Sequence, residues 1–117
     1  MSKMLKIAKD FTRTPGPRYI KEGRFSGEQF RESFLKPAIE HAINGSYRLL
    51  VDLDGTAGYG TSFLEESFGG LIREDKLDYE QIIKHIVLSS FEEEYLKDDI
   101  AEYLRDAHQQ SIGKLGK

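Results

Sequence analysis

One segment near the middle of the chain constrains the fold more than any other. Residues 47–53 predict a strand, and its residues 49–53 are apolar except for Asp52, a pattern typical of a strand that is covered on both faces. A glycine-rich loop at 54–60 follows, and a helical pattern begins near Thr61. A strand, a glycine-rich turn and a helix in this order predict an α/β fold in which the end of the strand positions a site.

The residues before this strand predict a helix. Ser26, followed three residues later by Gln29, is a capping-box pattern, and apolar residues then recur at helical spacing over 30–43. Pro37 lies inside the pattern and lacks the backbone N–H that a helix uses, so we expect a kink or a split there. Gly45 is expected to end the helix.

Shorter patterns complete the predicted fold. Residues 3–11 alternate in part and predict a strand, and 18–21 predict a second strand that forms a hairpin with it. The apolar run at 82–88 predicts a further strand, and Ser90 is expected to cap a last helix whose apolar positions include Phe91 and Tyr95. Helices that alternate with strands in this way predict a mostly parallel sheet.

Composition narrows the class of protein. The chain has 117 residues, so we expect one domain over residues 1–110 and a flexible tail over 111–117. A net charge of -3 argues against a broad basic face that binds nucleic acid. The absence of cysteine excludes disulfides and thiolate catalysis. No apolar run is long enough to cross a membrane and no signal peptide is evident, so we expect a cytoplasmic protein.

The glycine-rich loop allows two interpretations besides a plain turn. Gly55 and Gly60 have the spacing of a phosphate-binding P-loop, but Thr61 stands where that motif has its lysine. Loss of the lysine removes the main contact with phosphate, which argues against nucleotide hydrolysis. The loop is then either a protein-contact surface or a backbone cradle for a small anion. The candidate loop residues are Asp52, Asp54, Gly55, Gly58, Tyr59 and Gly60.

Carboxylates near the loop raise the question of a metal or acid–base site. Asp52 is expected to bind a backbone or hydroxyl group near the turn, and Asp54 is expected to form the turn. Glu65 fits a second capping box with Ser62, and Glu66 is expected on a solvated helix face. The three histidines are scattered, and none pairs with a nucleophile in the sequence. We therefore predict no enzymatic activity, no metal and no cofactor.

Two stretches of the chain resemble a known family. They are residues 25–31, Phe-Ser-Gly-Glu-Gln-Phe-Arg, and residues 50–73, which run from the central strand through Ser-Phe-Leu-Glu-Glu-Ser-Phe-Gly-Gly-Leu. Together they resemble the bacterial STAS-like domains of unknown function, over about residues 17–90. The resemblance implies a single STAS-like α/β domain with a mixed, mostly parallel sheet of four to five strands and with helices mainly on one side.

The same resemblance implies a role and candidate residues. In the anti-anti-sigma factors, the best understood soluble STAS domains, a strand runs into Asp-Ser-Ser-Gly-Leu at a helix start. A partner kinase of the histidine-kinase-like ATPase superfamily phosphorylates the first serine. Aligned without gaps, that stretch falls on residues 60–64, so Thr61 matches the phosphoacceptor and Ser62 the residue after it. Gly60 replaces the aspartate and Phe63 the glycine.

The sequence therefore predicts a non-enzymatic regulatory domain that binds a protein partner, which we expect to be such a kinase, and neither nucleic acid nor membrane. Phosphorylation of Thr61 or Ser62 would control binding, and Tyr59 would serve as an aromatic anchor if it points outward. The alternative is a small-molecule or nucleotide-binding module that uses the glycine-rich loop 55–60.

Overall fold

The computed structural model describes residues 3–115 and contains one three-stranded sheet. The strands are β1 (Met4–Lys6), β2 (Leu49–Asp52) and β3 (Ile86–Ser89), and they lie in the order β1-β2-β3. Both pairings are parallel. The predicted parallel α/β architecture is thus confirmed, but the sheet has three strands within the described residues, where the resemblance implied four or five.

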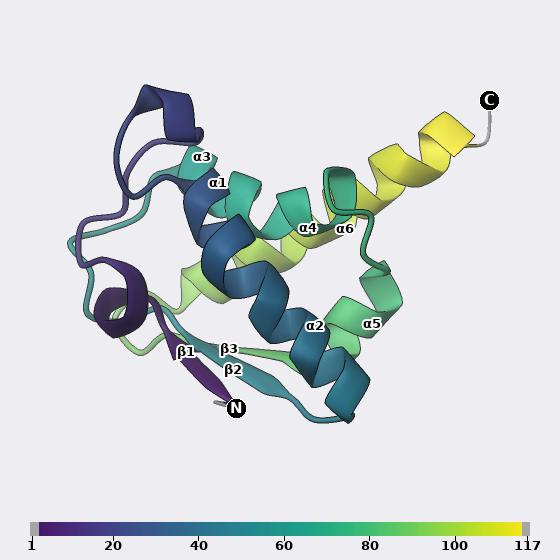
Figure 1. Ribbon diagram of the computed structural model, residues 1–117, viewed down its shortest axis with the longest axis horizontal. Helices are drawn as coiled ribbons and strands as arrows, with labels where there is room; N and C mark the ends of the chain where they lie inside the picture. The colour runs from purple at the N-terminus through teal and green to yellow at the C-terminus, as the bar shows by residue number, and fades with distance from the viewer. Residues whose placement is uncertain (1–2, 116–117) are drawn as a thin grey trace.

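Side-chain burial distinguishes the two faces of the sheet. Leu5, Val51 and Leu88 are in register and point toward the helices, and the first two are buried. The next row, Met4 and Val87, points the other way and is 43% and 36% exposed. In Figure 1 the sheet lies along the lower side of the molecule and the helices lie above it. The apolar pattern of residues 49–53 predicted a strand that is covered on both faces. That prediction is wrong, because the helices cover one face of the sheet.

The first helical unit runs from α1 (Gly27–Phe30) through a π-helical turn, η3 (Arg31–Leu35), into α2 (Lys36–Gly45). Ser26 Oγ accepts a hydrogen bond from Gln29 N at 3.0 Å, which confirms the predicted cap. The wider turn ends at Leu35, two residues before Pro37, so the predicted interruption of the helix near Lys36 is confirmed. The unit ends at Gly45, followed by Ser46 in the left-handed conformation.

The second helical unit begins just after the glycine-rich loop. It consists of α3 (Thr61–Leu64), a π-helical turn η4 (Glu65–Gly69) and α4 (Gly70–Arg73). It packs closely on the first unit, because a Cβ placed on Gly27 would lie 2.5 Å from the carbonyl oxygen of Phe63. Several aromatic rings fill the adjoining core: Phe11, Phe25, Phe30, Phe34 and Phe63.

In the amino-terminal segment, the strands predicted at 3–11 and 18–21 both differ in the structure. β1 covers only three residues, because Asp10 Oδ2 accepts a hydrogen bond from Lys6 N and the chain turns into η1 (Ile7–Phe11). The predicted strand at 18–21 is instead a loop that contains a 3-10 turn, η2 (Ile20–Glu22). Glutamate side chains accept hydrogen bonds from the backbone N–H groups of Tyr19 and Ile20, so no hairpin forms.

In the carboxyl-terminal half, the strand predicted at 82–88 and the predicted last helix both differ in the structure. Most of the predicted strand at 82–88 is helix α5 (Tyr79–His85), which Asp78 caps by accepting from Gln81 N at 3.0 Å. The last helix, α6 (Tyr95–Leu115), begins five residues after Ser90 and continues past residue 110, where the sequence predicted a tail. No helix among residues 3–115 is long and apolar enough to cross a membrane.

Candidate functional site

The glycine-rich loop lies at the carboxyl end of β2, next to the end of β3. Leu53 N donates to Ser89 O at 2.9 Å, which joins the two chain segments just beyond the strands. The chain then turns through residues 54–60 and enters α3. The predicted position of the loop, between a parallel strand and a helix, is therefore confirmed.

Asp54 fixes the neighbouring turn at the end of β3. Its carboxylate accepts hydrogen bonds from Phe91 N at 2.9 Å, from Glu92 N at 3.1 Å and from Ser90 Oγ at 3.1 Å. These hydrogen bonds, the strongest from the Phe91 amide, lower the pKa of Asp54 below its ordinary value. They also hold the chain in a turn after Ser90, which explains why α6 begins later than the sequence predicted.

Backbone amides of the loop already have partners within the protein. Gly55 N donates to Glu92 Oε1 at 2.9 Å, and Ala57 N donates to the carbonyl of Arg13 at 2.8 Å. Asp54 N donates to Asp52 Oδ1 at 3.0 Å, which confirms the predicted backbone role of Asp52. Gly58 has a positive φ of 140°, and a Cβ there would meet nothing within 4 Å. The loop is thus braced by its neighbours at three amides.

Tyr59 points into the protein and is half-buried. Its hydroxyl donates to the carbonyl of Leu53 at 2.7 Å, and its ring lies 5.9 Å from that of Phe63. Burial raises the pKa of Tyr59 well above its ordinary value, and the charges of Asp52 and Asp54 act in the same direction. Tyr59 braces the loop, so the condition under which it would serve as an aromatic anchor, an outward-pointing side chain, is not met.

Thr61 and Ser62 are both exposed in the first turn of α3. Gly60 is the residue that precedes the helix, in an extended conformation, and it offers no side chain to cap it. Ser62 lies inside the helix, so the predicted capping box of Ser62 and Glu65 is wrong. Among the described residues neither hydroxyl has a hydrogen-bond partner within the protein, which leaves both open to solvent.

Phe91, beside the loop, and Tyr95, the first residue of α6, are exposed aromatic residues that the sequence had placed among the apolar positions of the last helix. Phe91 is 88% exposed and Tyr95 is 58% exposed. Phe91 follows directly after Ser90, in the turn that Asp54 holds. The acidic run Glu92–Glu94 could have indicated that Phe91 and Tyr95 are exposed, because a buried helix start rarely carries three consecutive charges.

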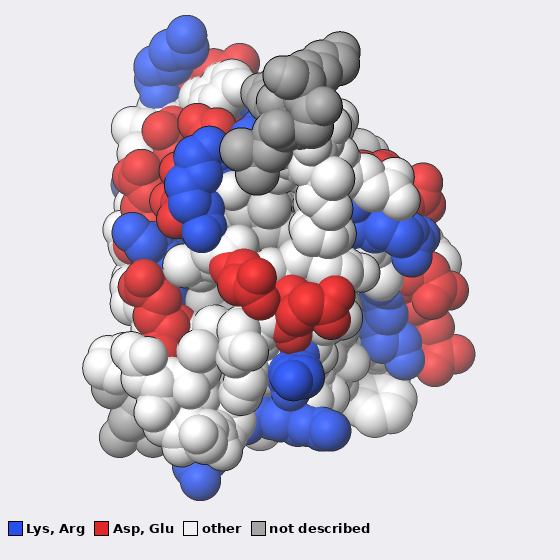
Figure 2. Space-filling model, turned by 90° about the vertical axis from the view of Figure 1, so that its right-hand side faces the viewer, with Lys and Arg blue, Asp and Glu red and all other residues white. Residues whose placement is uncertain are grey.

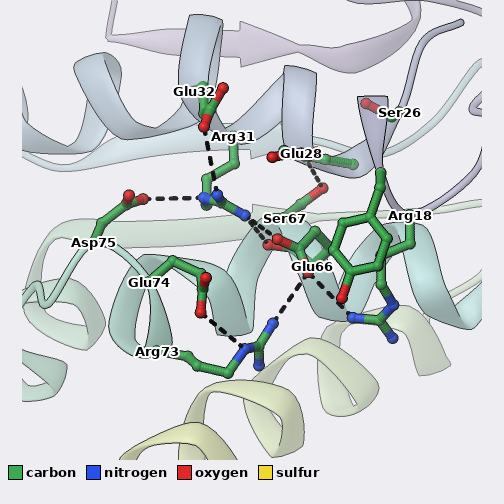
Figure 3. A network of polar contacts seen from close by, with 12 residues as sticks. Arg18, Ser26, Glu28, Arg31, Glu32, Glu66, Ser67, Arg73, Glu74 and Asp75 are labelled. Carbon is green, nitrogen blue, oxygen red and sulfur yellow. Dashed lines mark hydrogen bonds and ion pairs between the residues drawn. The ribbon is translucent and has the colours of Figure 1, made fainter. Parts of the chain in front are cut away.

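A buried ion-pair network lies between the two helical units (Figure 3), and the sequence analysis missed it. The guanidinium of Arg31 contacts the carboxylate of Glu66, and each residue is 3% exposed. Arg31 Nε also donates to Asp75 Oδ2 at 3.0 Å. Glu66 is therefore buried, contrary to the predicted solvated face, since η4 turns it toward Arg31.

Glu65 belongs to the outer part of this network. Its carboxylate pairs with Arg73 at 2.6 Å and with Arg18 at 2.5 Å. Partial burial acts to raise its pKa, but the hydrogen bonds and charges of the two arginines outweigh it and lower the pKa of Glu65. The carboxylates that raised the question of an acid–base site are thus engaged in structural contacts.

The remaining ionisable groups are dispersed. Among residues 3–115 no group of three or more His, Asp or Glu side chains has the arrangement of a metal site. His85 Nδ1 lies 2.7 Å from the carbonyl of Gln81, and His108 stacks on Tyr79 at 4.4 Å between ring centroids. On the face shown in Figure 2, basic and acidic side chains are interspersed with uncharged surface.

A protein-family model matches most of the chain. Residues 26–96 match the STAS-like domain of unknown function (DUF4325). The search of curated proteins and the search of solved structures found no match. The matched segment contains both helical units, β2, the glycine-rich loop, β3 and the Asp54-bound turn. Because the match covers more than half of the chain, the protein belongs to the family of STAS-like domains of unknown function.

Proposed function

We propose that this STAS-like domain is a non-enzymatic regulatory module that binds a protein partner at the carboxyl end of β2. The contact surface comprises the loop 54–60, the start of α3 and the turn that carries Phe91. One observation carries this proposal: Phe91 is 88% exposed while its own amide is held by the Asp54 carboxylate. We name this surface the loop face.

An exposed aromatic side chain on a fixed backbone suits a binding role. Aromatic residues are enriched among those that contribute most to protein interfaces. A turn that is already ordered loses little conformational entropy when a partner binds it. Asp54 orders the Phe91 turn, and Tyr59 orders the adjoining loop through its hydrogen bond to Leu53. The loop face is thus preorganised for binding.

The exposed hydroxyls of Thr61 and Ser62 provide a means of control. A phosphate on either would add about -1.5 to -2 charges at neutral pH. At the first turn of a helix that charge is tolerated, because the helix dipole favours it. Within a dry protein interface the same charge is costly, so phosphorylation would release the partner without unfolding the domain. A kinase of the histidine-kinase-like ATPase type fits both roles, as partner and as phosphate donor.

The small-molecule alternative receives less support from the loop geometry. An anion cradle requires free backbone N–H groups, yet those of Gly55 and Ala57 already donate within the protein. The carboxylates of Asp54 and Glu92 also lie at the loop and repel an anion. We therefore favour protein binding over small-molecule binding as the function of this domain.

A quantitative pull-down from an extract of the source cells tests this proposal. Wild type is compared with Phe91→Ala and Thr61→Asp, and with Ser33→Asp, a control at an exposed serine of the first helical unit. We expect a defined partner that wild type and the control retain and that the two loop-face variants lose. Equal capture by all four proteins would refute the role of the loop face.

Intact-mass analysis of the protein from the same cells tests the switch separately. A single added phosphate that is lost in Thr61→Ala or Ser62→Ala supports control by phosphorylation. If the wild-type protein carries no phosphate, phosphorylation is not part of the proposed function. A thermal-shift assay with ATP and GTP addresses the alternative. A rise in Tm that Gly58→Ala removes would favour nucleotide binding over the proposed function.

A further inference from the structure

The outer edge of β3 offers hydrogen-bonding groups to another strand. β3 is the last strand of the sheet, and within the described residues no strand pairs with its outer side. Ser89 O accepts a hydrogen bond from Leu53 N, so the backbone groups of Ser89 point toward β2. Because alternate residues of a parallel strand bond to opposite sides, the backbone groups of Ile86 and Leu88 point outward.

A groove of about 320 Å³ runs beside this edge, between β3, α5 and α6. Its lining includes Ile83, Ile86, Leu88, Lys97, Ala101 and Arg105. Ile86 and Leu88 are in register with Leu49 and Val51, which are fully covered by the helices. Ile86 and Leu88 themselves remain partly exposed. Helix α6 therefore extends beside a position that a fourth strand would occupy.

We propose that this groove binds an extended segment of another protein, which adds to the sheet as a fourth strand along β3. Only an extended polypeptide presents N–H and C=O groups at the spacing that the outward groups of Ile86 and Leu88 require. Alternate side chains of that segment would enter the apolar groove. The lining of this groove includes no residue of the loop face, and the proposal does not depend on the proposed function.

The charges beside the groove define the chemistry of the segment. Lys97 and Arg105 stand two helical turns apart on α6 and both line the groove. Arg105 is exposed and has no acidic partner within 4.0 Å among the described residues, while Lys97 has only the exposed Glu94 at 3.6 Å. The segment that fits has apolar residues at alternate positions and acidic residues at its ends.

The same charges disfavour a second copy of this chain as the occupant. Antiparallel pairing of two β3 strands across a two-fold axis would bring the α6 helices of both copies to one seam. Lys97 and Arg105 of each copy would then face those of the other. Like charges at such a seam oppose association, whereas acidic side chains complement them.

Labelled peptides test the proposal directly. We would use a pool of short peptides with Val, Ile, Leu or Phe at alternate positions, Thr between them and Glu at both ends. One matched pool carries Lys at the ends, and another carries N-methyl groups on alternate amides, which prevents strand pairing. Binding is measured by fluorescence anisotropy, and the site is mapped by amide chemical shifts of the full chain.

Two substitutions on α6 link binding to the groove. Ala101→Trp fills the groove from an exposed position, and Glu102→Trp places the same side chain on the neighbouring exposed residue as a control. We expect the Glu-ended pool to bind, with shifts at Ile86 and Leu88. Ala101→Trp, N-methylation and Lys ends should each weaken binding by about tenfold or more, the effect of losing ~1.4 kcal/mol.

Three results would overturn the proposal. The first is no binding of the Glu-ended pool, and the second is binding that N-methylation leaves unchanged or that maps to the loop face. The third is a dimer, seen by sedimentation, that Ala101→Trp dissociates, since this would assign the edge to a second copy. Phe91→Ala should not change peptide binding, so failure here is distinguishable from failure of the loop-face proposal.

Discussion

The guanidinium of Arg31 and the carboxylate of Glu66 meet in the contact between the two helical units, and both residues are almost completely buried. Arg31 also donates to the main-chain carbonyl of Glu66 at 3.0 Å. Each charge is thus neutralised where water has little access. Removal of one partner leaves the other charge desolvated, so the two residues behave as a unit.

Loss of either partner should therefore be costly. We expect Glu66→Leu or Arg31→Met to lower the free energy of unfolding by about 3–5 kcal/mol, since each leaves a buried charge without its main partner. The double variant should lose clearly less than the sum of the two. Urea unfolding measures all three. Glu32→Leu is the control, because Glu32 is exposed and lies 3.9 Å from Arg31. Additive losses would show that the pair is not coupled.

The contact of Gly27 with Phe63 gives a second prediction. A methyl group on Gly27 would lie 2.5 Å from the carbonyl oxygen of Phe63, and backbone atoms cannot yield as a flexible side chain does. We expect Gly27→Ala to lower the free energy of unfolding by about 1–3 kcal/mol. Gly113→Ala is the matched control, because a Cβ there meets nothing within 4 Å. It should leave Tm unchanged or raise it. Equal effects of Gly27→Ala and Gly113→Ala on stability would contradict the close approach of Gly27 to Phe63.

Asp54 should make the stability of its turn depend on pH. The pKa of Asp54 is lowered in the folded state, so its contribution is complete above the unfolded value of about 3.9. That contribution is lost as the pH falls through the lower, folded value. Asp54→Asn should abolish the part of the stability loss at acid pH that comes from Asp54. It should also speed hydrogen exchange of the Phe91 and Glu92 amides at neutral pH. Unchanged exchange at these amides would show that the carboxylate does not hold the turn.

Tyr59 provides a test of the loop itself. Tyr59→Phe removes the hydrogen bond to Leu53 and should lower the free energy of unfolding by about 1 kcal/mol. Ultraviolet titration should show one fewer high-pKa tyrosine in the variant, because burial raises the pKa of Tyr59 in the wild type. If the variant instead loses a tyrosine that titrates with an ordinary pKa, Tyr59 is not the buried hydroxyl that the structure shows. Tyr19→Phe, at an exposed tyrosine, is the control.

Local signals were sufficient to predict part of this fold. The Ser26 cap, the interruption before Pro37 and the strand at 49–52 each depend on a few neighbouring residues, and the structure contains all three. The strand predicted at 82–88 is correct only at 86–88, where β3 begins, because residues 82–85 belong to α5. Branched apolar residues in a short run fit a buried helix as well as a strand, and the Asp78 cap decides for helix α5.

The site was harder to predict, because its contacts join distant parts of the chain. The glycine-rich loop was located correctly from the strand that precedes it. The bond from Phe91 N to Asp54 spans 37 residues, and the contact of Arg31 with Glu66 spans 35. Spacing within one element carries no information on such pairs. For that reason Glu66 was taken for a surface residue and Phe91 for a core residue.

The parallel order of the strands also governs how the protein is made. Met4 pairs with Leu50, and Leu50 pairs with Val87, so a complete helical unit separates each strand from its neighbour in the sheet. No turn can bring two of the strands together locally. During synthesis on the ribosome, the sheet cannot close until the residues of β3 have left the exit tunnel. The first strand therefore waits until β2 and β3 have been made, and premature termination before residue 86 would leave open the edge of β2 that pairs with β3.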